Sequence, residues 1–124
     1  MSDAERRKRG IEMMKKVYGW DVGDPEGAFT EMTFDHLFGD VWSRDVMSIR
    51  ERRLLLIGLL VGYGLDDVVE LQLESGLRLG ELEPDELREI VVFLTHYAGW
   101  PRGAKLNGLV EKLLAQGQAT RGPE

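Results

Sequence analysis

The stretch SIRERRLLLIGLLV, from Ser48 to Val61, decides the fold class of this chain. Ser48 and Glu51 have the spacing of a capping box, in which each side chain accepts a hydrogen bond from the other residue's backbone amide. The residues from Leu54 to Val61 are apolar on every side of a helical wheel, so a helix formed by them must be covered all round. The stretch therefore predicts a buried helix.

The rest of the chain carries helix starts and stops and almost no strand signals. We expect a first helix that ends at Gly19 and one or two short helices from Asp24-Pro25 toward Gly39. Further helices are expected from Asp66 or Asp67 to Gly80, from Pro84 to Ala98, and over Leu106 to Leu114. The sequence thus predicts an all-α single domain over residues 1–124, in which 117–124 form a flexible tail.

The composition excludes several classes of protein. The 124 residues include no cysteine, which rules out disulfides, thiol nucleophiles and zinc–thiolate sites. A net charge of −6 argues against nucleic acid as a partner. The longest apolar run, Leu54 to Leu65, is shorter than the roughly 20 residues of a bilayer span, and the charged N-terminus does not have the pattern of a secretory signal. We expect a cytoplasmic protein with no membrane partner.

Metal and cofactor motifs are missing from the sequence. The chain has two histidines, His36 and His96, whereas a mononuclear metal site takes three or four ligands, usually at paired spacings. The glycine motifs that bind dinucleotides or phosphates and the nucleophile elbow of hydrolases do not occur. We expect no metal and no cofactor.

The helix predicted from Pro84 to Ala98 carries apolar residues on two sides. Leu87, Val91 and Leu94 belong to one stripe, and Phe93 lies away from it. A chain of 124 residues has difficulty covering two helices that are apolar all round, so the pattern predicts burial between subunits of a symmetric oligomer.

The segment THYAGWPR, from Thr95 to Arg102, concentrates chemically useful side chains across a helix end. It holds the imidazole of His96, the phenol of Tyr97, the indole of Trp100 and a guanidinium within eight residues. Two interpretations stand at this point. In the first, the aromatic rings are core residues and His96 is a hydrogen-bonded buried histidine. In the second, the segment forms a binding or catalytic site.

Six segments together resemble the carboxymuconolactone decarboxylase family, within the alkylhydroperoxidase-like superfamily. They are Arg9–Glu12, Phe38–Ser43, Arg50–Gly58, Glu70–Gly80, Glu86–Phe93 and Tyr97–Pro101, so the resemblance covers roughly residues 9–115. It implies a compact, all-helical subunit of about six helices that assembles into a homotrimer or a homohexamer.

The resemblance implies a reaction as well. The peroxidase branch of the superfamily uses a Cys-x-x-Cys motif, which this chain lacks, so that activity is excluded. The decarboxylase branch removes carbon dioxide from a carboxylated unsaturated lactone without a cofactor, in aromatic-compound catabolism. Gln72 and Phe93 stand where that branch often has histidines, so this chain lacks an imidazole at those two positions.

The candidate site follows from the resemblance and from what decarboxylation requires. An acid must protonate carbon, donors must stabilise an oxyanion, and cations must hold carboxylates. We expect His96 and Arg52 as catalytic residues, with His36 as a reserve for the acid. The expected substrate-binding residues are Phe38, Trp42, Arg44, Gln72, Tyr97 and Trp100.

A second function stays open: a non-catalytic small-molecule-binding or structural oligomer that kept the fold. The enzyme hypothesis requires His96 and an arginine to face one cavity. The alternative predicts that a backbone carbonyl satisfies His96 and that no cavity lies beside it.

Overall fold

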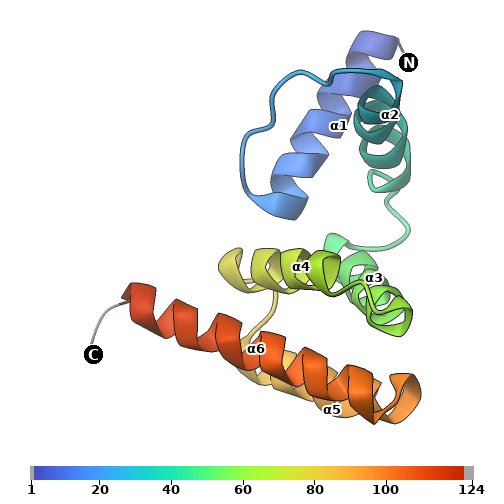
Figure 1. The fold of residues 1–124 in the computed structure, drawn as a ribbon. Coiled ribbons are helices and arrows are strands. Elements are labelled where there is room, and N and C mark those ends of the chain that lie inside the picture. Colours follow the sequence, from blue (N-terminus) through green and yellow to red (C-terminus); the bar gives the residue numbers. More distant parts are fainter. Residues whose placement is uncertain (1, 122–124) are drawn as a thin grey trace. The chain divides into compact units, whose positions relative to one another are not determined.

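The computed structural model describes residues 2–121, and within that range every regular element is helical. The elements are α1 (Asp3–Tyr18), α2 (Ala28–Met32), the π-helix η1 (Thr33–Val41), α3 (Ile49–Tyr63), α4 (Asp66–Arg78), α5 (Pro84–Ala98) and α6 (Trp100–Arg121) (Figure 1). The predicted all-α fold is confirmed. Among these helices none combines the length and apolar composition needed to cross a membrane.

The chain forms two compact units, Met1–Arg52 and Arg53–Glu124, with the boundary inside α3. Each unit has its own helix packing and is described separately below. The single domain expected from the sequence stays a prediction.

In the first unit, α1 lies beside η1 (Figure 1). Ser2 caps α1, because its Oγ accepts from the Glu5 amide at 3.1 Å while Glu5 accepts from the Ser2 amide at 3.3 Å. The helix ends as predicted at Gly19, whose φ of 78° is left-handed and suits glycine. Buried side chains fill the space between the helices: Met14, Val17, Phe34, Phe38 and Trp42.

The one or two short helices predicted for residues 24–39 are confirmed as α2 and η1, but their predicted bounds are wrong. Asp24-Pro25 does not start a helix; α2 starts at Ala28, because Gly27 with a φ of 84° sets the entry of the chain. Gly39 does not stop the helix either, since η1 continues to Val41. Gly39 instead gives room to α1: a Cβ there would lie 2.7 Å from the backbone oxygen of Arg6.

The second unit is built on the helix starts that the sequence predicts. Helix α3 runs into this unit from its capping box in the first unit, where Glu51 N–H donates to Ser48 Oγ at 3.0 Å and Ser48 N–H donates to Glu51 at 2.8 Å. Asp66 is the first residue of α4, and Pro84 begins α5. Twelve buried side chains form the core of this unit: Ile57, Leu60, Val61, Val69, Leu73, Leu82, Leu87, Val91, Leu106, Val110, Leu113 and Leu114.

Helices α5 and α6 form a hairpin (Figure 1) around Gly99, whose φ is 101°. Helix α6 continues to Arg121, into the segment that the sequence predicts as a tail. The rest of that predicted tail, 122–124, lies outside the described residues.

Candidate functional site

A cavity of about 360 Å³ lies between α5 and α6 within the second unit. Its volume is in the range of small-molecule sites. Its lining comes from one face of each helix: Val91, Val92, Thr95 and His96 from α5, and Trp100, Gly103, Ala104 and Asn107 from α6.

The floor of this cavity depends on the close approach of α6 to α5. A Cβ on Gly103 would lie 2.1 Å from Thr95 Oγ1, so only glycine allows the helices to pack this closely here. Thr95 Oγ1 donates to Val91 O at 2.6 Å and is thereby held against its own helix. The sequence of α6 thus shapes the cavity through the absence of a side chain.

The His96 ring lines this cavity, and a hydrogen bond to the backbone fixes its tautomer. Its Nδ1 is 2.6 Å from Val92 O, and since a carbonyl oxygen only accepts, Nδ1 carries the proton. In the neutral ring Nε2 then holds the lone pair, and in the cation Nε2 holds the second proton. The ring stands edge-on to Trp100, with centroids 5.9 Å apart. His96 can therefore act as a base or an acid through Nε2.

The structure agrees in part with the enzyme hypothesis and in part with the non-catalytic alternative. A backbone carbonyl satisfies His96 Nδ1, as the binding alternative predicts, yet a cavity lies beside the ring, as the enzyme hypothesis predicts. Within the described part of the chain, the lining contains no arginine.

Two further predicted residues of the second unit lie outside that lining. Tyr97 is 82% exposed and packs on the Phe93 ring, with centroids 5.4 Å apart. Gln72 is buried, and its Oε1 accepts a hydrogen bond from Arg53 Nη1 at 3.0 Å. Gln72 is thus bound to a buried polar network of the second unit.

That network was missed by sequence reasoning, which singled out the neighbouring Arg52. Arg53 is fully buried, and its Nε and Nη2 donate to the two carboxylate oxygens of Glu81 at 2.7 and 3.2 Å. A signal was available, because Arg53 has helical spacing to the buried Ile57 and Leu60 and so shares their face. An arginine on an apolar stripe predicts a buried ion pair.

The other predicted residues belong to the first unit. Phe38 and Trp42 are buried and their rings stack, with centroids 5.7 Å apart. Arg44 is exposed in the turn after η1. Arg52 is half-buried, and its Nη1 donates to Met47 O at 2.9 Å. The proposed roles of these four residues stay predictions.

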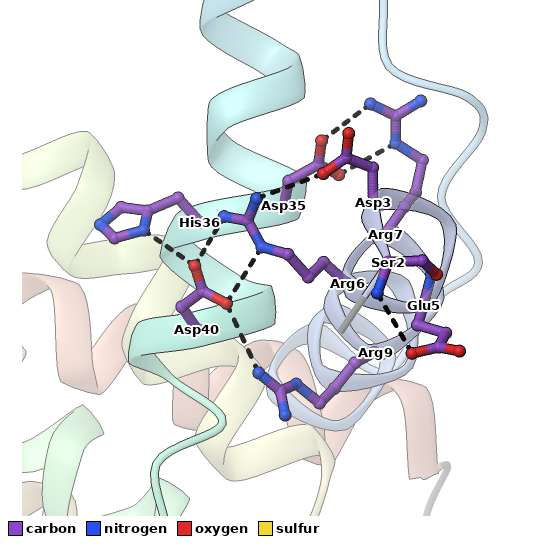
Figure 2. A network of polar contacts seen from close by, with 9 residues as sticks. All are labelled: Ser2, Asp3, Glu5, Arg6, Arg7, Arg9, Asp35, His36 and Asp40. Atoms are coloured by element: carbon purple, nitrogen blue, oxygen red, sulfur yellow. Dashed lines mark hydrogen bonds and ion pairs between the residues drawn. The ribbon is translucent and has the colours of Figure 1, made fainter.

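The reserve histidine, His36, belongs to a polar network between η1 and α1 (Figure 2). Its Nδ1 lies 3.1 Å from Asp40 Oδ2, which also accepts from Arg6 Nη2 at 2.6 Å. Arg9 reaches the other oxygen of Asp40 at 3.4 Å, and Arg7 makes a two-pronged pair with Asp35. The carboxylates of η1 thus hold the arginines of α1. Within residues 2–121 no cluster of three or more potential metal ligands occurs.

The Asp40 cluster predicts an acid-sensitive contact. The hydrogen bonds from Arg6 and then His36 lower the pKa of Asp40 from 3.8 to about 2. A pKa that is lower in the folded state stabilises the fold above pH 4 and loses that effect as the pH falls from about 4 to about 2. We expect the melting temperature of Asp40→Asn to fall less steeply than that of the wild type over this interval. The exposed Asp45→Asn is the control, and a wild-type slope in Asp40→Asn would contradict the assignment.

Comparison with known proteins supports the family resemblance. No protein-family model matches the chain. A curated protein named 4-carboxymuconolactone decarboxylase, from Acinetobacter baylyi, is 28% identical over 109 residues, which covers 82% of this chain and 81% of the relative. The resemblance to the carboxymuconolactone decarboxylase family is thereby confirmed.

Proposed function

Starting from its distant relationship to a 4-carboxymuconolactone decarboxylase, we propose that this chain is a cofactor-independent carboxy-lyase. Its substrate is a small carboxylated unsaturated lactone or a related organic acid from aromatic-compound catabolism. The observation that carries the proposal is His96, which has a defined tautomer and lies in a cavity of about 360 Å³. Without a metal or organic cofactor, such a site has to supply a proton and stabilise negative charge.

The proposed reaction breaks the bond between the ring carbon and the carboxylate carbon. Its electron pair moves through the double bond into the lactone carbonyl, and carbon dioxide leaves. The His96 imidazolium then protonates carbon from Nε2, while its Nδ1 stays bonded to Val92 O. Solvent returns the proton to Nε2. Val91, Val92 and Ala104 place apolar side chains beside the departing carboxylate, and of these Val91 is buried while Val92 and Ala104 are exposed in the chain.

Arginines and further subunits complete this proposal. Arg52 remains the proposed catalytic cation and Arg44 a proposed substrate ligand; their proposed partner is a carboxylate that the substrate keeps, while the departing carboxylate lies in the uncharged His96 cavity. A homotrimer or homohexamer is proposed as the assembly. Its support is the apolar surface on both apolar helices, where Leu55 and Leu59 on α3 and Phe93 on α5 are more than half exposed in the chain.

Turnover of 4-carboxymuconolactone tests the function. We expect the purified protein to release carbon dioxide and form the enol-lactone. His96→Ala should lower kcat about 100-fold or more, because a positioned general acid contributes roughly 10² to 10⁴ in rate. The exposed side chain of His96 predicts little change in melting temperature.

The matched variant is His36→Ala, which removes the chain's other histidine. Loss of turnover in His36→Ala and not in His96→Ala would move the acid to the first unit. Full turnover in both variants would refute a histidine acid.

The alternative, a non-catalytic small-molecule-binding oligomer, is favoured by one observation. Gln72 stands where the family often has a histidine, and its carbonyl oxygen is engaged by Arg53. A folded protein that binds lactones without releasing carbon dioxide would establish this second function.

A further inference from the structure

The lining of the His96 cavity is almost free of charge. Apart from the His96 ring, its described residues carry no ionisable group. Three cations on the same helices are engaged elsewhere: Arg88 pairs with Glu111 at 3.1 Å, Lys105 with Asp66 at 3.7 Å and Lys112 with Glu70 at 2.6 Å. Arg102 of α6 is exposed and is not among the lining residues. The cavity therefore offers a ligand no fixed positive charge.

The lining also contains the side-chain amide of Asn107, which is available to bind a ligand. Thr95 Oγ1 donates to Val91 O and His96 Nδ1 to Val92 O, whereas no hydrogen bond to the Asn107 amide occurs within the described chain. Asn107 lies two helical turns after Trp100, with Gly103 and Ala104 between them on the same face of α6. The Trp100 ring and the Asn107 amide thus lie on either side of Gly103 and Ala104 along this face.

We infer that this cavity binds the uncharged ring of a lactone and that the Asn107 amide donates a hydrogen bond to the ring carbonyl. The inference rests on the proposed function and names the group that stabilises its oxyanion. Electron flow from the breaking bond places negative charge on that carbonyl oxygen, so the bond from Asn107 strengthens as the reaction proceeds. A carboxylate in the same cavity meets apolar side chains and no cation, so no ion pair offsets the water it loses on binding there.

This arrangement has a consequence for binding. The neutral lactone should bind more tightly than the same ring bearing a carboxylate, although the carboxylated compound is the substrate. A site built to recognise the carboxylate would show the reverse order.

The probes are but-2-en-4-olide and its 4-carboxylate, titrated into the full-length chain while the Asn107 amide and Trp100 indole signals are followed by NMR. We expect the neutral lactone to bind about 10-fold more tightly, and Asn107→Leu to lose about 10-fold of that affinity, as the loss of one hydrogen bond predicts. Asn107→Asp, of nearly the same shape, should lower kcat more than Asn107→Leu does, since its negative charge opposes the negative charge that develops on the carbonyl oxygen. Gly108→Ala is the control on the same helix, because a Cβ there meets nothing within 4 Å.

Tighter binding of the carboxylate, or unchanged affinity in both Asn107 variants, would overturn the inference. Turnover that survives Asn107→Leu unchanged would overturn the role of Asn107 while leaving the decarboxylase proposal intact. Preferential binding of the neutral lactone that depends on Asn107, without any release of carbon dioxide, would support the ligand assignment and refute the decarboxylase.

Discussion

Replacement of Arg53 by methionine is expected to lower the free energy of unfolding by about 3 to 5 kcal/mol, the usual cost of removing one partner from a buried ion pair. The guanidinium is fully buried and forms two hydrogen bonds with Glu81 and one with Gln72. Methionine has a similar length but no donor, so the Glu81 carboxylate loses a cation inside the second unit.

The surrounding backbone is shaped to this arginine. A Cβ on Gly76 would lie 3.1 Å from Arg53 Cδ and 2.7 Å from Leu82 Cδ1, so glycine leaves the space through which the arginine passes. Arg53→Lys should recover only part of the loss, because an ammonium group cannot reproduce the two-pronged contact with Glu81.

Urea unfolding followed by circular dichroism measures this effect. The control is Arg52→Met, a neighbouring half-buried arginine whose Nη1 donates to Met47 O. We expect the control to change stability by about 1 kcal/mol or less. Equal midpoints for the two variants would show that the buried network does not stabilise the fold. If Arg53→Met proves insoluble, Glu81→Gln gives the same comparison with a milder change.

Gly10→Ala is expected to destabilise the packing of α1 on η1 by on the order of 3 kcal/mol, the upper part of the range for overpacking. A Cβ on Gly10 would lie 1.9 Å from Phe34 O and 2.8 Å from its carbonyl carbon. These are backbone atoms that cannot rotate away, so the two helices must separate. Separation would strain the ion pairs from Arg6 and Arg7 to η1.

Gly23→Ala in the same unit is the matched control, because nothing lies within 4 Å of a Cβ there. Near-ultraviolet circular dichroism reports on the stacked rings of Phe38 and Trp42 beside this interface. We expect Gly10→Ala to melt earlier and to lose part of that signal, while Gly23→Ala stays close to the wild type. Indistinguishable behaviour of the two variants would refute the close packing at Gly10.

Helix starts were predictable where the signal is local. The capping box formed by Ser48 and Glu51 marks the start of α3, and Pro84 marks the start of α5, because both signals act within one helical turn. Asp24-Pro25 carries the same kind of signal and starts no helix, since Gly27 turns the chain just before α2. No local sequence signal predicts the π-helix η1, which occurs where Gly39 packs against α1.

The candidate site was predictable in part. His96 and Trp100 were named from the sequence, and they share one cavity. Asn107 was missed because a single amide on a helix has no motif, and its position becomes meaningful only when α5 and α6 pack together. Arg53 was missed by one residue: Arg52 and Arg53 differ in their angle around α3 by about 100°, which decides between the surface and the core.

The sequence by itself determined the all-α class, several helix boundaries and the resemblance to the decarboxylase family, because these depend on hydrophobic periodicity, caps and residue order. The tertiary structure alone decided which polar groups meet. How closely the helices approach decides which groups pair with Arg53, how Thr95 packs against Gly103 and which residues surround His96. That distance is set at Gly10, Gly76 and Gly103, where the missing side chain matters only once a second helix packs against it.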